Sequence, residues 1–212
     1  MSAKKSYAVF GLGKYGEAVA KELSDRGMDV LAVDIDPKTV EDVVGILPVC
    51  KCADVTDPEV LAQLGIADID VVIISMASNL EASVLAVTLC RELGVGRIIA
   101  KCASEMHRKI LLRVGADSVV FPEQESGVRL AKNLLSSGFV DMISLSDEVS
   151  VVELDVKDEW VGRNLIELNL RKRYSVNVVA MKRNGTVELT GKTDDPFGAL
   201  AWVANLAVDR GR

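Results

Sequence analysis

Short apolar runs alternate with longer amphipathic stretches from the N-terminus to about residue 138. The apolar runs predict strands at 7–11, 30–34, 49–52, 71–75, 98–101 and 118–121. The stretches that follow them have helical spacing, at 17–26, 39–46, 58–64, 80–93, 105–114 and 125–137. Six strand–helix units in succession predict an α/β fold with a doubly wound, six-stranded parallel sheet. The strands are continuously apolar, which is typical of sheets covered by helices on both faces.

The pattern changes after the sixth unit. Apolar and polar residues alternate at 149–156, and further strand-like runs lie at 176–182 and 186–189. The last two runs flank Asn184-Gly185, a dipeptide typical of hairpin turns. We therefore expect two domains, a doubly wound domain at 1–138 and a small α+β lobe at 139–212.

Three glycines follow the first predicted strand at the spacing G-x-G-x-x-G, namely Gly11, Gly13 and Gly16. Between a strand and a helix, this motif is typical of Rossmann-like nucleotide sites, where the backbone approaches phosphate at a helix N-terminus. The second predicted strand ends at Asp34, where a carboxylate can accept hydrogen bonds from ribose hydroxyls. Ligands of such sheets lie beyond the carboxyl ends of the strands, so the same crevice would adjoin Asp54, 76–79, Lys101 and Glu123. The alternative is a glycine turn that binds no ligand.

Composition narrows the class of protein. The chain has 212 residues, 49% hydrophobic and only 4% aromatic, which indicates an aliphatic core. Its net charge of -6 gives no electrostatic reason to expect a nucleic-acid partner. We expect no signal peptide, and the longest apolar runs, at 71–74 and 199–208, fall short of the roughly 20 residues that span a bilayer.

The four cysteines, Cys50, Cys52, Cys90 and Cys102, form no C-x-x-C pair. The chain has one histidine, His107, so a zinc site with several nitrogen and sulfur ligands is not expected. We interpret the cysteines as buried, reduced thiols of a cytosolic protein.

Together these residues resemble the regulatory subunits of Ktr/Trk-type potassium uptake systems, which carry an RCK nucleotide-binding domain and a small C-terminal RCK lobe. The resemblance extends from Tyr7 to about Lys182. It rests on the segments 9–16 and 31–36, on Gly115-Ala116-Asp117 with Phe121-Pro122-Glu123, and on 143–148. The sequence departs from the family after about residue 190, where we expect an altered lobe or a poorly ordered tail.

The resemblance implies a cytosolic, homo-oligomeric ring of dimers, such as an octamer, at the inner face of the cell membrane. Such a ring binds ATP or ADP, or alternatively NAD or NADH, and gates a membrane potassium channel. Carried over by position, the nucleotide contacts are Gly11, Gly13, Lys14, Tyr15, Gly16, Asp34, Ile35, Asp36, Asp54, Val55, Met76, Ala77, Ser78, Asn79, Lys101, Cys102, Ala103, His107 and Glu123. Lys14 stands where Ktr proteins place an arginine on the terminal phosphate. The positive charge is kept, but the planar guanidinium, which can form two parallel hydrogen bonds to a phosphate, is lost.

Three of the implied residues have a second interpretation. Glu123 would approach the phosphates of the neighbouring subunit through a bridging Mg2+ or Ca2+; otherwise it is a helix N-terminal glutamate stabilised by the helix dipole. His107 is either a nucleotide contact or a surface helix residue. Arg171 matches a cyclic di-AMP contact of family lobes, and the alternative is a solvated surface arginine.

Two other functions compete with a regulatory switch. One is an NAD(H)-dependent oxidoreductase, which would need a substrate pocket and a general acid or base. With one histidine and no Tyr-x-x-x-Lys at Tyr7, Tyr15 or Tyr174, we find no such group and expect the chain not to be an enzyme. The other is a structural oligomerisation module with a vestigial nucleotide site.

Overall fold

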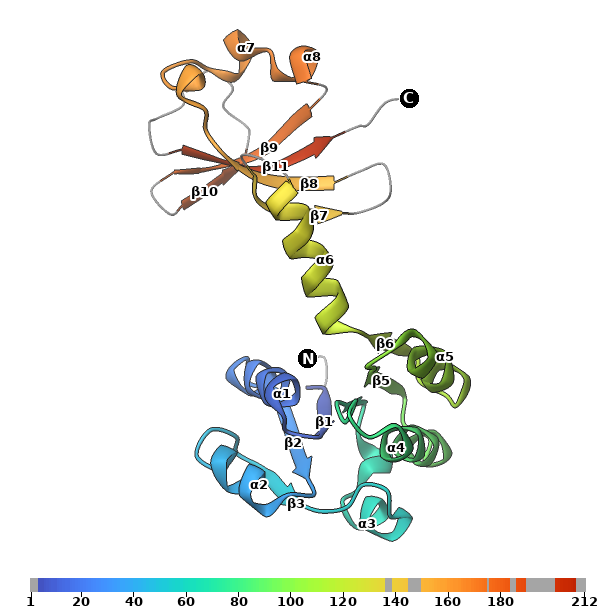
Figure 1. The fold of residues 1–212 in the computed structure, drawn as a ribbon. Coiled ribbons are helices and arrows are strands. Elements are labelled where there is room, and N and C mark those ends of the chain that lie inside the picture. The colour runs from blue at the N-terminus through green and yellow to red at the C-terminus, as the bar shows by residue number, and fades with distance from the viewer. Residues whose placement is uncertain are drawn as a thin grey trace. The chain divides into compact units, whose positions relative to one another are not determined.

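The computed structural model describes residues 4–135, 139–144, 150–174, 176–183, 186–189 and 201–208. The chain divides into two compact units, Met1–Pro122 and Glu123–Arg212. This division lies before the boundary expected at 138, so most of the last helix of the repeating pattern belongs to the second unit. Figure 1 draws both units.

The first unit is a parallel sheet of six strands in the order β3-β2-β1-β4-β5-β6. Its strands are β1 (Ser6–Phe10), β2 (Asp29–Asp34), β3 (Cys50–Cys52), β4 (Val71–Ile74), β5 (Arg97–Lys101) and β6 (Ser118–Val120). Its helices are α1 (Lys14–Asp25), α2 (Pro37–Val43), α3 (Pro58–Gln63), the 3-10 turn η1 (Ile66–Asp68), α4 (Leu80–Glu92) and α5 (Glu105–Arg113). The strand order changes direction between β1 and β4, and the predicted doubly wound, Rossmann-like fold is confirmed.

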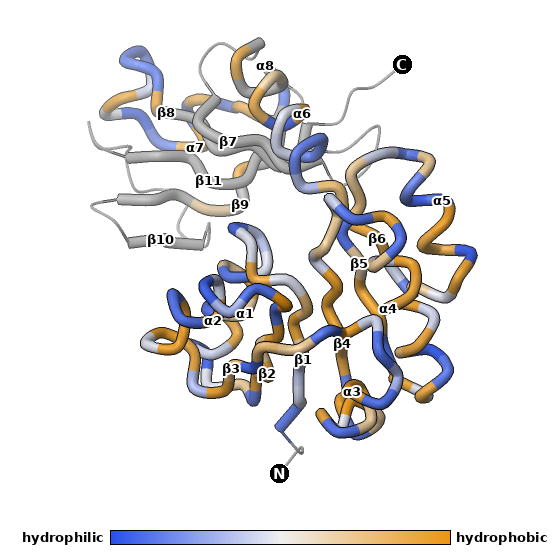
Figure 2. Tube along the Cα trace, turned by 60° about the horizontal axis from the view of Figure 1, so that its bottom comes forward, coloured by the Kyte–Doolittle hydropathy of each residue, from blue (hydrophilic) through white to orange (hydrophobic). Residues whose placement is uncertain are grey.

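Helices cover both faces of this sheet, α1 and α2 on one and α3, α4 and α5 on the other (Figure 1). Neighbouring strand residues alternate between two buried clusters. Val71 and Ile73 pack with α1 and α2, while Val72 and Ile74 pack with α3, α4 and α5. The tube is accordingly hydrophobic along all of β4 (Figure 2). A continuously apolar strand therefore reflects burial on both sides.

The second unit contains helix α6 (Pro122–Leu135) and an antiparallel sheet in the order β10-β9-β11-β8-β7. The strands are β7 (Phe139–Ser144), β8 (Ser150–Asp155), β9 (Val176–Arg183), β10 (Thr186–Leu189) and β11 (Ala201–Val208). The 3-10 turn η2 (Asp158–Trp160) and helices α7 (Leu165–Leu168) and α8 (Leu170–Tyr174) connect β8 to β9. The expected β9–β10 hairpin is present, although its turn residues, Asn184 and Gly185, lie outside the described residues.

The C-terminal strand lies in the segment for which we expect an altered lobe or a poorly ordered tail, and of this segment the structure describes 201–208. Strand β11 pairs with β8 on one side and with β9 on the other, which makes it the middle strand of the sheet. Residues 201–208 of the apolar run therefore form a strand whose two edges are both hydrogen-bonded within the lobe. Without β11, the other four strands would form two separate pairs, β9 with β10 and β7 with β8.

The cysteines are only partly as expected. Cys90 and Cys102 are fully buried, and burial raises the pKa of the Cys90 thiol to about 12. Cys50 is half-buried and Cys52 is exposed, because β3 is the edge strand of the sheet. The interpretation of all four as buried thiols is therefore wrong for Cys52. Within the described ranges, no helix has the length and hydropathy needed to cross a bilayer.

Candidate nucleotide-binding site

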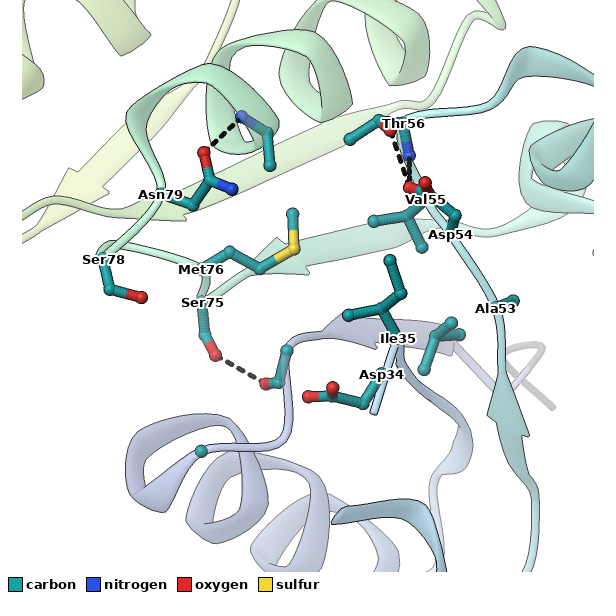
Figure 3. A pocket seen from close by; sticks show the side chains of 14 residues that line it. Asp34, Ile35, Ala53, Asp54, Val55, Thr56, Ser75, Met76, Ser78 and Asn79 are labelled. Atoms are coloured by element: carbon teal, nitrogen blue, oxygen red, sulfur yellow. Dashed lines mark hydrogen bonds between the residues drawn. The ribbon is translucent and has the colours of Figure 1, made fainter. Parts of the chain in front are cut away.

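A cavity of about 370 Å³ opens at the carboxyl ends of β1, β2, β3 and β4, within the first unit (Figure 3). Its lining combines backbone from the glycine loop, two carboxylates and several apolar side chains. The lining residues are Gly11, Gly13, Val33, Asp34, Ile35, Ala53, Asp54, Val55, Thr56, Ser75, Met76, Ser78, Asn79 and Ala82. This is the edge at which ligands of doubly wound sheets bind.

The three motif glycines differ in backbone conformation and in what surrounds them. Gly11 has a φ of +86°, a backbone conformation that other residues rarely adopt. At Gly16, an added Cβ would lie 1.9 Å from the Gly11 carbonyl oxygen and 2.5 Å from the Ser75 hydroxyl oxygen. At Gly13, no described atom lies within 4 Å of an added Cβ. The fold thus explains Gly11 and Gly16, whereas Gly13 leaves open space where a ligand could approach the backbone.

Helix α1 begins at this loop without a side-chain cap. Its N-cap residue, Gly13, has an extended backbone and no side chain that could accept from the first turn. The next four helices are each capped, by Asp36, Asp57, Asn79 and Ser104. The first-turn N–H groups of a helix and the helix dipole favour an anion, so the start of α1 is a candidate anion-binding position.

Asp34 connects the glycine loop to the second strand. One carboxylate oxygen accepts from the Leu12 backbone N–H at 2.6 Å, and the other accepts from the Asp36 backbone N–H at 2.9 Å. The side chain is half-buried and lines the cavity. A carboxylate held from both sides by backbone donors has a fixed position, and its remaining lone pairs can accept from hydroxyl groups of a ligand.

The opposite part of the cavity is mainly apolar. Ile35, Val55 and Met76 face one another there (Figure 3). Beside them, Asp54 accepts from the hydroxyl of Thr56 at 2.6 Å and from its backbone N–H at 2.9 Å. The hydroxyl bond and then the N–H bond lower the pKa of Asp54, so this carboxylate is ionised at neutral pH. An apolar slot with fixed acceptors at its rim suits a planar heterocycle with amino groups.

Comparison with known proteins supplies the family. A family model described as the TrkA-N domain matches residues 7–122. The Ktr system potassium uptake protein C of Bacillus subtilis (strain 168) is 38% identical over 184 residues, which are 87% of this chain and 83% of that protein. The chain belongs to the TrkA-N family.

This TrkA-N chain has further relatives of the same kind. The Ktr system potassium uptake protein A of Bacillus subtilis (strain 168) is 35% identical over 191 residues, covering 90% of this chain and 86% of that protein. Among solved structures, the GsuK channel bound to NAD has a TM-score of 0.69 at 18% identity, over 99% of this chain. The chain spans 38% of that channel's length, and the likeness concerns the fold. The suspected resemblance to Ktr/Trk proteins is thus confirmed.

In this TrkA-N chain, nine of the expected contact residues line the cavity: Gly11, Gly13, Asp34, Ile35, Asp54, Val55, Met76, Ser78 and Asn79. Five lining residues were not expected, namely Val33, Ala53, Thr56, Ser75 and Ala82. The sequence could have indicated Ser75, because it directly follows the apolar strand β4. In the structure its hydroxyl donates to the Gly11 carbonyl at 2.6 Å. The sequence could also have indicated Thr56, because Asp54-Val55-Thr56 favours a local turn that is closed by the Asp54 side chain.

The other expected residues lie outside the lining: Lys14, Tyr15, Gly16, Asp36, Ala77, Lys101, Cys102, Ala103, His107 and Glu123. Gly16 is packed against Gly11, and Asp36 caps α2 through bonds from Lys38 and Thr39. Lys101, the last residue of β5, extends toward α1, where its ammonium lies 5.6 Å from the centre of the Tyr15 ring. Lys14, Tyr15 and Lys101 therefore adjoin the start of α1 without forming the cavity wall.

His107 is buried, with 5% of its surface exposed. Its Nε2 lies 2.9 Å from the Ser83 hydroxyl, which itself donates to the Leu80 carbonyl, and its Nδ1 accepts from the Ala103 backbone N–H at 3.4 Å. These contacts fit the neutral tautomer with its proton on Nε2. Burial lowers the pKa of His107. The expectation of a surface residue is wrong, because the ring links α4 to α5 inside the unit.

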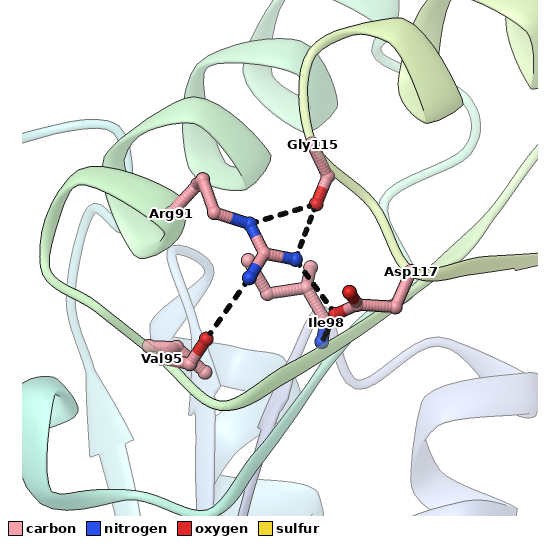
Figure 4. Close-up of polar contacts among 5 residues, drawn as sticks. All are labelled: Arg91, Val95, Ile98, Gly115 and Asp117. Carbon is pink, nitrogen blue, oxygen red and sulfur yellow. Dashed lines mark hydrogen bonds and ion pairs between the residues drawn. The ribbon is translucent and has the colours of Figure 1, made fainter.

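Gly115-Ala116-Asp117, part of the family resemblance, directly precedes β6, at the amino end of that strand. Figure 4 shows Gly115 and Asp117 beside Arg91 of α4. The Arg91 guanidinium donates to the Gly115 carbonyl at 2.6 and 3.0 Å and to the Asp117 carboxylate at 2.7 Å. Asp117 also accepts from the Ile98 backbone N–H at 2.6 Å. Burial acts to raise the pKa of Asp117, but these donors outweigh it and the net shift is downward. The motif thus joins the end of α4 to the starts of β5 and β6.

The residues expected to serve other ligands belong to the second unit. Glu123 lies in the first turn of α6, and Arg171 lies in α8. In the part of the chain that the structure describes, no group of three or more His, Cys, Asp or Glu side chains could hold a metal ion. A cation at Glu123 would therefore need ligands from elsewhere, such as phosphate oxygens or a second subunit.

Proposed function

We propose that this TrkA-N protein is the cytoplasmic, nucleotide-sensing regulatory subunit of a membrane potassium transport system. Two relatives that share most of its length are named Ktr system potassium uptake proteins, which supports the transport role. The observation that carries the sensing role is the cavity of about 370 Å³ beside the uncapped start of α1. A similar solved structure is named as a channel bound to NAD, which supports a nucleotide as the ligand.

The chemistry of the cavity matches the three parts of a nucleotide. Asp34 would accept hydrogen bonds from the ribose, and the apolar walls at Ile35, Val55 and Met76 would enclose the base. The phosphates would lie at the first turn of α1, where Lys14 and Lys101 add positive charge. A polyphosphate uses both lysines, so we propose ATP and ADP as ligands, with NAD or NADH as the alternative.

Regulation requires that the two nucleotides stabilise different conformations. ATP differs from ADP by one phosphoryl group, and a ligand shifts an equilibrium only through its differential affinity for the two states. We therefore propose that the third phosphate is contacted from outside the cavity, by Glu123 of a neighbouring subunit through Mg2+ or Ca2+. In this proposal the protein is a homo-oligomer, a ring of dimers such as an octamer, that acts on a membrane channel subunit.

Exposed apolar side chains are consistent with such an assembly. On α5, Met106 is 67% exposed, and on α6, Leu130 and Leu134 are 60% and 78% exposed. Large apolar side chains left in water on one helix face favour burial against another protein surface. The lobe is proposed in addition to bind cyclic di-AMP through Arg171, which belongs to α8.

The proposal is tested by binding and by flux. Calorimetry on the purified protein should give saturable binding of ATP and ADP, and co-expression with a membrane potassium channel subunit should allow the two to be purified together. Potassium flux in vesicles that contain both proteins should differ between ATP and ADP. Saturable binding without any effect on flux would indicate that the protein is a structural oligomerisation module. NADH consumption with a panel of carbonyl compounds would indicate an oxidoreductase.

A further inference from the structure

One peptide group of the glycine loop is held from both sides of β1. The Ser75 hydroxyl, just beyond the end of β4, donates to the Gly11 carbonyl at 2.6 Å, the dashed line beside Asp34 in Figure 3. On the other side, the Leu12 N–H donates to one carboxylate oxygen of Asp34 at 2.6 Å. The Gly11 carbonyl and the Leu12 N–H belong to the same trans peptide, in which the two groups point in opposite directions. This peptide therefore joins the end of β4 to the end of β2.

Ser75 itself is fixed by the backbone of β1. Its N–H donates to the Phe10 carbonyl at 2.8 Å, and its hydroxyl donates to the next carbonyl along the chain, that of Gly11. Gly16 of α1 covers the hydroxyl, since a Cβ added to Gly16 would lie 2.5 Å from the Ser75 oxygen. Because the single hydroxyl proton is donated to the loop, Ser75 can act toward a ligand in the cavity only as an acceptor.

The bond is important because of the group at the other end of the peptide. Asp34 lies at the proposed ribose position, and one of its two backbone donors is the Leu12 N–H. Without the Ser75 hydroxyl, the peptide would be free to tilt, and the Leu12 N–H would no longer fix the carboxylate oxygen. A ligand would then have to order that carboxylate on binding, which lowers affinity.

We propose that Ser75 is a positioning residue, which orients the Asp34 carboxylate for the ribose hydroxyls through the peptide between Gly11 and Leu12. The proposal rests on the proposed nucleotide function and gives Ser75 a part in selecting ligands that carry a ribose 2′-hydroxyl. The other role open to Ser75 is a direct contact between its oxygen and the ligand. A direct contact would not depend on Asp34, so the two roles differ in what happens when Asp34 is removed.

The test compares ADP with 2′-deoxy-ADP by calorimetry. The wild type should bind ADP more tightly, because 2′-deoxy-ADP lacks a hydroxyl from which Asp34 can accept, and equal affinities would overturn the proposal. A neutral hydrogen bond corresponds to roughly a twofold to tenfold change in a binding constant. Ser75→Ala should weaken ADP by up to this factor and 2′-deoxy-ADP less, which reduces the preference for the ribose ligand. Ser75→Thr keeps the hydroxyl and should retain the preference.

Two further variants separate positioning from other effects. In an Asp34→Ala background, Ser75→Ala should not alter the preference further, whereas a direct contact would keep its full effect. Ser6→Ala is the matched control, because the Ser6 hydroxyl links the same two strands at their amino ends, by donating to the Asp70 carboxylate at 3.0 Å. Ser6→Ala should lower stability but leave the preference unchanged. An effect of Ser75→Ala that persists without Asp34, or that Ser6→Ala reproduces, would overturn the proposal.

A second readout needs no nucleotide. The Leu12 amide proton, which is bonded to a carboxylate, should give a downfield NMR signal in the wild type that moves upfield in Ser75→Ala and not in Ser6→Ala. An unmoved Leu12 signal in Ser75→Ala would overturn the coupling. If the wild type binds neither ADP nor ATP, the proposed function fails and the role of Ser75 with it. If the wild type binds them and Ser75→Ala keeps the wild-type preference, only the positioning role fails.

Discussion

His107 shows how one buried side chain makes stability depend on pH. The ring is held neutral between the Ser83 hydroxyl and the Ala103 N–H, and burial lowers its pKa below the ordinary value of 6.5. As pH falls below 6.5, the unfolded chain takes up a proton before the folded protein does. As the pH is lowered, the free energy of unfolding should therefore decrease, by at most about 1.4 kcal/mol per pH unit, until the pH reaches the pKa of His107 in the folded protein.

The measurement is urea unfolding at several pH values between 7.5 and 5. The variant His107→Gln removes the titration and can still donate to Ser83, so its stability should change less over this range. The carboxylates with lowered pKa, Asp36, Asp54, Asp70 and Asp117, titrate in the folded state below their ordinary value of 3.8. Parallel stability profiles for the wild type and His107→Gln would contradict this role of the histidine.

Asp34 sets a second prediction at the scale of one residue, because its carboxylate is fixed at the proposed ribose position. A phosphate on the ribose 2′-hydroxyl would bring like charge against it, so NADP should bind more weakly than ATP, ADP or NAD. Asp34→Asn should weaken the binding of ligands with a free ribose 2′-hydroxyl, namely ATP, ADP and NAD. It should also reduce the discrimination against NADP. The matched control is Asp57→Asn, which changes a helix cap outside the cavity and should leave affinities unchanged. Calorimetry that finds NADP tighter than ATP would refute the assignment.

At the scale of elements, the strand–loop–helix unit of β1 and α1 predicts opposite outcomes for two glycines. Gly16→Ala places a methyl group 1.9 Å from the Gly11 carbonyl oxygen and should destabilise the fold by about 1–3 kcal/mol through overpacking. Gly13→Ala meets no described atom within 4 Å and has a φ of -62°, so it should cost at most about 1 kcal/mol. The added methyl would nevertheless point toward the phosphate position and should abolish nucleotide binding.

Urea unfolding and calorimetry on the same two variants separate these effects. A Gly13→Ala protein that is stable but does not bind ADP would support a ligand site at the loop. A Gly13→Ala protein with wild-type affinity would favour the alternative of a glycine turn without ligand.

Elements set by local pattern were predictable, and contacts between distant elements were not. Each predicted strand of the first unit overlaps the strand observed. The pattern is clearest at β4, where burial on both faces leaves a purely apolar run. The starts of α2 and α6 lie earlier than predicted, at Pro37 and Pro122, where proline suits the first turn.

Residues whose role depends on strand order or on remote partners were misread. Cys52 is exposed because β3 is an edge strand, and His107 is buried because Ser83 lies opposite it on α4. Gly115-Ala116-Asp117 was a marker of the family without a known role, and its bonds to Arg91 and Ile98 explain it as a structural link. The cavity was largely predictable, since the carboxyl ends of parallel strands meet at one edge.

At the scale of the whole molecule, the proposed ligand site and the proposed cation ligand belong to different units. The cavity lies in Met1–Pro122, whereas Glu123 begins Glu123–Arg212. A lysine beside the cavity can bind phosphate but cannot report on how neighbouring subunits are arranged. A carboxylate from a second subunit can, provided that a divalent cation joins it to the terminal phosphate, since two anions otherwise repel. The coupling needed is modest, on the order of 1–3 kcal/mol.

Glu123→Gln should therefore retain ATP binding in the absence of divalent cations but lose the increase in ATP affinity, and in channel activation, that Mg2+ or Ca2+ produces in the wild type. Glu125→Gln is the matched control, because it removes the same charge from the same first turn of α6 and should keep the full cation effect. Calorimetry with and without the cation measures the affinities, and potassium flux measures activation. An equal cation effect in the wild type and in Glu123→Gln would exclude the bridge, and Glu123 would then be a glutamate that stabilises the start of α6 through the helix dipole.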